Sequence, residues 1–222
     1  MLTKNEKSFT VIFILLVVLE RITDLIPSLN DLYYLAKPLI VLSLIIYFIN
    51  NSSQLNKNTK NFTVLALIFS LLGDVLLMFQ NNSPNFFISG LAAFLTAHIF
   101  YSILFNTIRD THKKPFTFIS ILLIYAVVSF SLFQDNLGEM LIPVLLYIIV
   151  ILIMATMAFL RKNIIKSSYN WVLLGAIIFM LSDSTIAINK FYTSFSAAST
   201  TIMLTYALAQ YLIVFGILKQ QD

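Results

Sequence analysis

The sequence predicts an all-α membrane protein, with eight transmembrane helices in a single domain. Composition is the first observation behind this prediction: 59% of the 222 residues are hydrophobic, 11% are charged, and the mean hydropathy is +0.90. A soluble domain of this length needs far more polar surface. The second observation is that apolar runs close to the ~20 residues of a spanning helix recur along the whole chain.

Eight apolar runs carry this prediction. They cover residues 9–26, 32–49, 62–80, 86–106, 116–133, 139–160, 170–190 and 197–218. The first run is the weakest, because Glu20, Arg21 and Asp24 interrupt it. No small-residue cleavage site follows it, so we expect it to stay in the bilayer and not to act as a signal peptide. The connections are short, and we therefore treat residues 1–222 as one domain.

The basic residues predict the orientation in the membrane. Eleven of the fourteen lysines and arginines fall at the chain ends and in alternate loops, and the opposite loops contain none. These eleven are Lys4, Lys7, Lys57, Lys60, Arg109, Lys113, Lys114, Arg161, Lys162, Lys166 and Lys219. Cytoplasmic loops carry such an excess, so both termini are predicted to be cytoplasmic. The net charge of +4 then reflects topology and not nucleic-acid binding. The many Asn, Lys, Ile and Phe residues favour an AT-rich bacterial genome, and hence the bacterial inner membrane.

Two apolar segments resemble each other. ALIFSLLGD ends at Asp74 and AIIFMLSD ends at Asp183. The helix after each segment carries a polar residue after alanine, at His98 and at Gln210. The two copies lie four spans apart and would run in the same direction. The pattern suggests a parallel four-plus-four repeat.

Ionisable residues within the predicted helices collect at one depth. With a rise of about 1.5 Å per residue, Asp74 and Asp183 lie about 18–20 Å from the cytoplasmic edge of a ~30 Å core. The other members of this layer are Glu20, Arg21, Asp24, Lys37 and Tyr206. His98 and Gln210 lie about two turns closer to the cytoplasm. A carboxylate at membrane depth costs several kcal/mol unless it is paired, hydrated or protonated, and it marks a functional site.

The charge balance of this layer points to acid–base chemistry. Four acids face two bases, Arg21 and Lys37, so two acids remain uncompensated. Two buried like charges share a proton, which leaves one carboxylic acid beside one carboxylate. This pair can donate a proton to a substrate while it activates a water. Asp74 and Asp183 are therefore the candidate catalytic residues, and the sequence does not assign which of them is the acid.

Each of these residues also has a structural interpretation. Arg21 with Asp24 is equally well explained as an ion pair that ties the first helix to the second. Lys37, which precedes Pro38, can extend toward the membrane surface, and His98 can be a packing histidine that bonds Tyr101 or Ser102. The two aspartates can serve only to hold helices together. Gly73 and Ser182 precede the aspartates and would let a backbone or a substrate approach closely. Lys190 fits an interfacial anchor.

Several chemistries lack their residues. The chain has no cysteine, which excludes disulfides and thiolate catalysis. The second histidine, His112, lies in a predicted loop far from the layer, so a metal hydrolase lacks its ligands. Glycine-rich phosphate loops and a G-x-S-x-G motif are absent. We therefore expect no cofactor and no metal.

The same residues resemble a known family. ALIFSLLGDVLLMF, ISGLAAFLTAHIFYSILF and GAIIFMLSDSTIAINKF are similar to the most recognisable segments of the YhhN, or lysoplasmalogenase, family. Lys37-Pro38 and LTYALAQYLI are similar as well, and the resemblance covers nearly the whole chain in order. It implies an integral membrane hydrolase that cleaves the vinyl ether bond of lysoplasmalogens, with Asp74 and Asp183 as catalytic residues. The expected partners are a lysophospholipid substrate and membrane lipid.

The remaining site residues are assigned as candidates for substrate binding. His98, Tyr101, Tyr206 and Gln210 are expected to line the pocket, and Lys37 or Arg21 to hold the phosphate. Glu20 and Asp24 complete this set through their place in the same layer. Two rival functions stay open: a small lipid or solute transporter or flippase, because charges near the midplane also mark transporters, and a non-catalytic membrane sensor. Only a hydrolase forms a product from the lipid.

Overall fold

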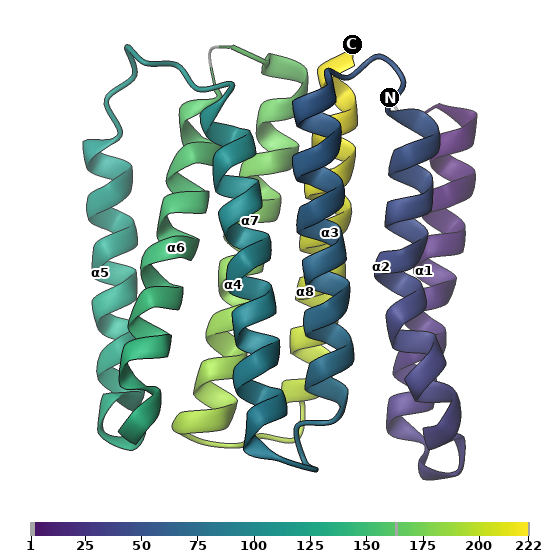
Figure 1. Ribbon diagram of the computed structural model, residues 1–222, viewed down its shortest axis with the longest axis vertical. Coiled ribbons are helices and arrows are strands. Elements are labelled where there is room, and N and C mark those ends of the chain that lie inside the picture. The colour runs from purple at the N-terminus through teal and green to yellow at the C-terminus, as the bar shows by residue number, and fades with distance from the viewer. Residues whose placement is uncertain (1–2, 163, 222) are drawn as a thin grey trace.

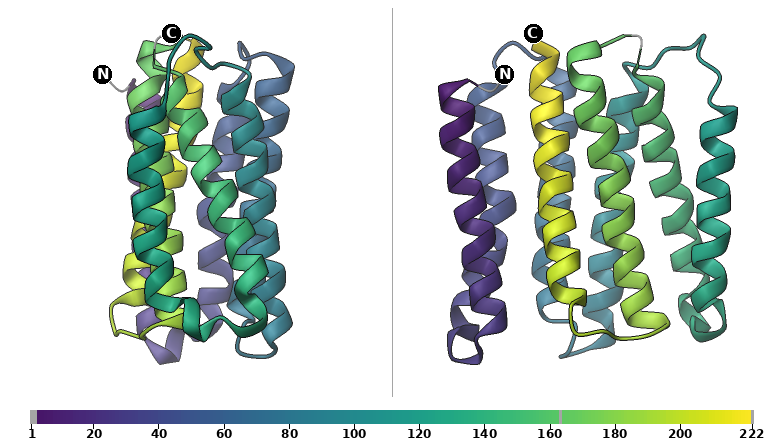
Figure 2. Two further views of the ribbon diagram at one scale, coloured as in Figure 1. Left: turned by 90° about the vertical axis from the view of Figure 1, so that its left-hand side faces the viewer. Right: turned by 180° about the vertical axis from the view of Figure 1, so that it is seen from behind.

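The computed structural model describes residues 3–162 and 164–221, and long helices dominate this part of the chain. The helices are α1 (Lys4–Leu25), α2 (Asn30–Asn51), α3 (Lys57–Met78), α4 (Pro84–Asn106), α5 (Phe116–Phe133), α6 (Leu141–Leu160), α7 (Lys166–Phe191) and α8 (Ala198–Leu218). They stand side by side and alternate in direction (Figures 1 and 2). Short 3-10 turns lie at Pro27–Leu29, Gln134–Asn136, Gly138–Met140 and Lys219–Gln221.

Within the described residues, seven helical segments are long and apolar enough to cross a membrane. They contain α2 to α8. The remaining helix, α1, is as long as α2, with 22 residues, and runs beside it (Figure 1). Charge distinguishes it, because Glu20, Arg21 and Asp24 fall within its last two turns. The predicted all-helical class is confirmed, with helices long and apolar enough to span a membrane.

The first and third helices begin earlier than their apolar runs predict. α1 starts at Lys4 because Thr3 forms a capping box with Glu6: the hydroxyl accepts from the Glu6 N–H at 3.2 Å, and the Glu6 carboxylate accepts from the Thr3 N–H at 2.6 Å. α3 starts at Lys57 because the Asn56 side chain accepts from the Thr59 N–H at 2.8 Å. Polar caps of this kind stabilise the first turn, which hydropathy alone does not detect.

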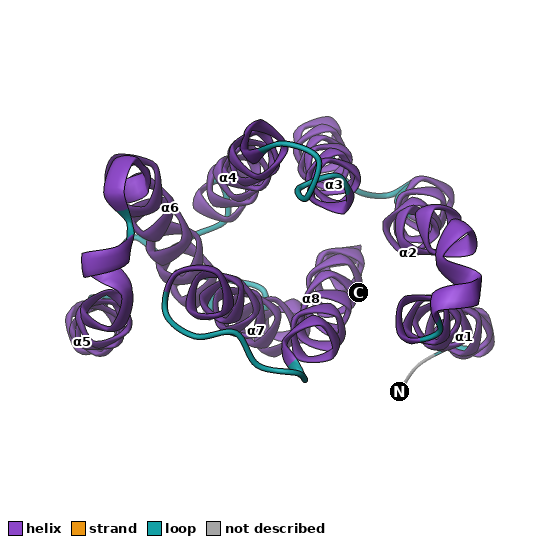
Figure 3. Cartoon of the chain, turned by 90° about the horizontal axis from the view of Figure 1, so that it is seen from below, coloured by secondary structure: helices purple, strands orange, loops and turns teal. Residues whose placement is uncertain are grey.

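Helix contacts run around a closed ring. Its order is α2, α3, α4, α6, α7, α8 and back to α2 (Figure 3). α1 packs against α2 and α8, and α5 packs outside the ring against α6 and α7. The two extremes of burial are α8, whose span is 72% buried, and α5, whose span is 11% buried. α8 is therefore the helix against which the site is built, and α5 is a peripheral wall.

Both aspartate-bearing helices pack closely against the helix that follows them. A Cβ on Gly73 of α3 would lie 2.6 Å from the ring of Phe94 on α4, and a Cβ on Gly216 of α8 would lie 2.6 Å from Val172 on α7. A side chain at either glycine would force its neighbours to shift, so glycine lets these helices approach closely. These two hairpins are the parts that the proposed four-plus-four repeat would relate, and that repeat stays a hypothesis.

The two ends of the described chain lie at the same end of the bundle (Figure 1). An even number of crossing helices produces this arrangement. The cytoplasmic placement of that end stays a prediction from the basic residues.

Candidate active site

A polar cavity of about 400 Å³ lies between α1, α2, α3, α4, α7 and α8. Six of the ten residues predicted for the site line it: Arg21, Asp24, Lys37, Asp74, Asp183 and Tyr206. Its rim comes from the helix ends opposite the two termini, at Asn30, Asn81 and Lys190. The helices thus bring both motif aspartates and three cationic side chains to a single space near one end of the bundle.

Asp74 occupies the α3 side of this cavity. Asp74 is only 3% exposed, and its Oδ2 accepts a hydrogen bond from the Tyr206 hydroxyl of α8 at 2.7 Å. The close contact between Gly73 and Phe94, described above, brings α3 against α4 beside this carboxylate. A tyrosine from the most buried helix therefore orients Asp74.

Asp183 of α7 is held by two donors on a single oxygen. The Tyr147 hydroxyl of α6 donates to Oδ2 at 2.6 Å, and Nε2 of His98 on α4 lies 2.8 Å from the same atom. His98 Nε2 also lies 2.9 Å from the Tyr147 oxygen. Nε2 must carry a proton to donate to Asp183. The histidine tautomer is therefore assigned from the hydrogen-bond network. Three helices thus fix this carboxylate.

Lys37 extends into the cavity. Its Nζ donates to the Tyr33 hydroxyl at 3.1 Å, one turn earlier on α2. Lys190 also lines the cavity, and its Nζ lies 4.8 Å from the centre of the Phe87 ring. Neither lysine has a salt bridge to a carboxylate among the described residues. Both can therefore attract an anionic ligand.

Arg21 forms an ion-pair cluster with both neighbouring acids. Its guanidinium donates to Glu20 through Nε and Nη2, and Nη1 lies 3.0 Å from Asp24 Oδ2. The Ser199 hydroxyl of α8 donates to the same Asp24 oxygen at 2.6 Å. The cluster thus ties α1 to α8, whereas the sequence suggested a tie to α2. Because two carboxylates already bind Arg21, Lys37 is the better candidate for a phosphate.

Tyr101 and Gln210 occupy a different place from the one expected. The Tyr101 hydroxyl donates to Gln210 Oε1 at 2.8 Å, and both residues are fully buried. Contrary to the expectation of pocket-lining roles, neither residue lines the polar cavity. They form a hydrogen bond to each other between α4 and α8 instead. His98 does not line the cavity either, and it reaches the site through Asp183.

Sequence reasoning missed Tyr147 and Ser199. Tyr147 lies within the apolar stretch VLLYIIVIL of α6, where a buried tyrosine hydroxyl needs a partner. This need for a polar partner could have marked Tyr147 as a candidate site residue. Ser199 follows a turn at the start of α8, and nothing in its local sequence distinguishes it.

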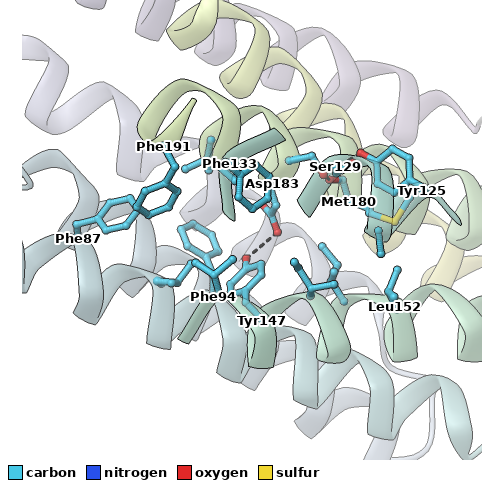
Figure 4. Close-up of a pocket in the computed structure, with 18 of the residues that line it drawn as sticks. Phe87, Phe94, Tyr125, Ser129, Phe133, Tyr147, Leu152, Met180, Asp183 and Phe191 are labelled. Atoms are coloured by element: carbon cyan, nitrogen blue, oxygen red, sulfur yellow. Dashed lines mark hydrogen bonds between the residues drawn. The ribbon is translucent and has the colours of Figure 1, made fainter. Parts of the chain in front are cut away.

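Asp183 also lines a second, apolar pocket of about 70 Å³ between α3, α4, α5, α6 and α7 (Figure 4). The two cavities share the residues Leu77, Phe87, Phe94, Asp183 and Ile186. Asp183 is the one ionisable residue in this shared set. The carboxylate thus stands at the boundary between a polar and an apolar space.

The fold and this site define a multi-pass membrane protein in which two aspartates line one polar cavity. The chain belongs to the YhhN family, whose model matches residues 32–217. It is similar to lysoplasmalogenase TMEM86A of Bos taurus, with 28% identity over 164 residues, and to human TMEM86A, with 28% identity over 165 residues. Human lysoplasmalogenase TMEM86B is 31% identical over 155 residues.

These matches cover most of this chain but less of the relatives. The aligned part is 71% of this chain for both TMEM86A proteins and 69% for TMEM86B. It spans 65% of each TMEM86A and 62% of TMEM86B, slightly under two thirds of their lengths. No solved structure gives a significant match to the chain.

Proposed function

We propose that this protein hydrolyses the vinyl ether bond of lysoplasmalogens. The products are a fatty aldehyde and glycerophosphoethanolamine or glycerophosphocholine. Membership of the YhhN family and the lysoplasmalogenase relatives support this activity. The paired aspartates support a mechanism by acid and base.

The position of Asp183 is the observation that carries the proposal. A lysoplasmalogen joins a zwitterionic head to one hydrocarbon chain through the vinyl ether. Asp183 lies where the polar cavity meets the apolar pocket. A lipid with its head in the former and its chain in the latter has its scissile bond beside this carboxylate.

The polar cavity suits the head group. Lys37 lines it without a carboxylate partner among the described residues, and it can bind the phosphate. The cluster of Glu20, Arg21 and Asp24 carries one net negative charge, which favours the ammonium of ethanolamine or choline. Arg21 thereby acts through its acids and not as a phosphate ligand.

The first chemical step is protonation of carbon. Asp183, protonated on Oδ1, gives its proton to the vinyl carbon nearer the chain, and the carbon bonded to oxygen becomes an oxocarbenium ion. Hydrogen bonds from Tyr147 and His98 to Oδ2 stabilise the carboxylate that remains. The proton is delivered on the apolar side, where that carbon lies.

The second step is addition of water. Asp74, on the polar side and oriented by Tyr206, takes a proton from a water that attacks the oxocarbenium carbon. The resulting hemiacetal collapses: Asp74 returns its proton to the departing glycerol oxygen, and Asp183 takes the proton of the hemiacetal hydroxyl. Both residues regain their starting states, and the net reaction consumes one water.

The proposed setting is the bacterial inner membrane, with both termini in the cytoplasm. The rim of the polar cavity lies at the opposite end of the bundle, so the head group would be taken from the outer leaflet. A reporter fused after Asp222 should be active only as a cytoplasmic reporter. Periplasmic activity of this fusion would reverse the sidedness.

Mass spectrometry of the purified full chain with three matched lysophospholipids tests the function. The vinyl ether lipid should yield aldehyde, while the saturated alkyl ether should bind and remain intact because it has no double bond to protonate. Equal cleavage of vinyl ether, alkyl ether and ester lipids would contradict the proposed mechanism. Binding of the vinyl ether lipid without any product would favour a transporter or sensor.

A further inference from the structure

The apolar pocket beside Asp183 has an aromatic end near the polar rim and extends from there along α5 and α6. Phe87, Phe133 and Phe191 form the aromatic end, with ring centroids 6.0 Å apart for Phe87 and Phe191 and 6.5 Å apart for Phe133 and Phe191. Figure 4 shows Asp183 between this aromatic end and the end formed by Tyr125 and Leu152. A chain that starts at Asp183 therefore runs toward Leu152, away from the polar rim.

The outer wall of this pocket is α5, the least buried of the spans. Only Leu122 and Phe133 of α5 are buried, and only 11% of the span is buried. Among the described residues, one side-chain hydrogen bond joins this helix to another, from the Tyr125 hydroxyl to Ser184 Oγ at 2.8 Å. Ser184 follows Asp183 directly. The wall is thus attached weakly, and its attachment lies next to the proposed acid.

We propose that this pocket binds the hydrocarbon chain of a single-chain lipid and that α5 is a movable wall which admits it from the bilayer. The proposal rests on the function proposed above. Its basis is the continuity of the apolar pocket with the polar cavity at Asp183. The pocket volume of about 70 Å³ is well below the ~300–1,000 Å³ of typical ligand pockets, so a long chain enters only as α5 moves outward.

The faces of α5 supply a matched pair of variants. Ala126 lines the pocket, whereas its neighbour Val127 is 66% exposed on the lipid side. Ala126→Phe fills the pocket, and Val127→Phe adds the same ring toward lipid. A second pair is Ser129→Phe, inside the pocket, with Val128→Phe, which changes a residue that is 57% exposed. The second pair keeps the test valid if Ala126→Phe does not fold.

Photo-crosslinking measures chain binding without turnover. The probe is a saturated alkyl-ether lysophosphocholine with a diazirine near the end of its chain, applied to the full chain in nanodiscs. We expect crosslinks in segments 125–133 and 144–152, about tenfold reduced by the pocket-filling variants and unchanged by the lipid-facing ones. The loss should be larger for a long-chain probe than for a short-chain probe.

Two results would overturn the chain site: crosslinks confined to other helices, or equal losses in both members of each pair. The result is independent of the chemistry, because the probe cannot be hydrolysed. Expected crosslinks without vinyl ether hydrolysis by the wild type would retain the chain site and reject the proposed function. Hydrolysis with crosslinks elsewhere would retain the function and reject the chain site.

Discussion

The surroundings of Asp74 and Asp183 differ, although the two motifs are similar in sequence. Asp74 accepts one recorded side-chain hydrogen bond, from Tyr206, and lines only the polar cavity. Asp183 accepts from both Tyr147 and His98 and lines both cavities. The difference teaches that two similar motifs can place their carboxylates in different surroundings, because the hydrogen-bond partners come from helices outside the motif.

The two tasks that we propose for the aspartates are based on these surroundings. A carboxylate at the apolar boundary, with two donors on one oxygen, is suited to give up a proton from the other oxygen. A carboxylate that faces only the polar cavity, which also contains Lys37, is suited to activate water. Variants of the residues around each aspartate should therefore change turnover, binding and stability by different amounts.

The largest expected effect is that of removing either carboxylate. Asp74→Asn and Asp183→Asn should each lower turnover by at least ~10²-fold with binding largely kept, because acid and base are both required. The double variant should be little worse than either single variant, since the two residues act as one unit. Steady-state kinetics with a vinyl ether lysolipid measures this. Activity kept in either variant would assign that aspartate a structural role.

Thermal unfolding in detergent is the control for these variants. Two aspartates that share one proton repel each other when both are ionised, so each single Asn variant should be no less stable than wild type. A marked loss of stability in both variants would favour helix-to-helix attachment as their role.

Removing the hydroxyl of Tyr206 or of Tyr147 should affect turnover to different degrees. Tyr206→Phe removes the one side-chain hydrogen bond recorded for Asp74, and we expect turnover to fall by about tenfold. Tyr147→Phe leaves His98 on Asp183, so its effect should be about threefold or less. Equal losses in kcat would contradict the different support of the two carboxylates.

Lys37 should affect binding more than chemistry. Lys37→Gln removes the proposed phosphate contact, and we expect KM to rise about tenfold while kcat is kept. Lys190→Gln is the matched control, because Lys190 lines the same cavity and is exposed. Its effect should be smaller. A fall in kcat without a change in KM for Lys37→Gln would place this lysine in the chemistry.

The smallest effect is expected at the ion-pair cluster between α1 and α8. Ser199→Ala removes the hydroxyl that donates to Asp24, and the free energy of unfolding should fall by about 1 kcal/mol. Turnover should stay within about twofold of wild type, because Ser199 bonds Arg21 and Asp24 and neither of the two proposed catalytic aspartates. A large loss of turnover would indicate that this cluster takes part in catalysis.

Much of the fold could be predicted, because a spanning helix has a strong hydropathy signal. The eight apolar runs all correspond to helices, and their errors fall at polar starts such as Lys4, where a capping box extends the helix. The aspartates could be placed at one depth by counting residues along helices. Depth alone does not give lateral position, and for that reason Tyr101 and Gln210 were expected in the pocket but pair with each other behind it.

The partners of each carboxylate could not be predicted for the same reason. Tyr147 reaches Asp183 because α6 lies between α4 and α7 in the ring, and helix order around a ring is absent from a hydropathy pattern. The apolar pocket depends on how loosely α5 packs, which is equally invisible in a uniformly apolar sequence.

The most direct test of the central claim is hydrolysis of a vinyl ether lysolipid in D₂O, with the aldehyde trapped by reduction and analysed by mass spectrometry. If Asp183 protonates carbon, the product carries one deuterium on the carbon next to the former carbonyl, and Asp183→Asn forms almost none of it. An aldehyde without that deuterium, or full labelled product from Asp183→Asn, would contradict the account.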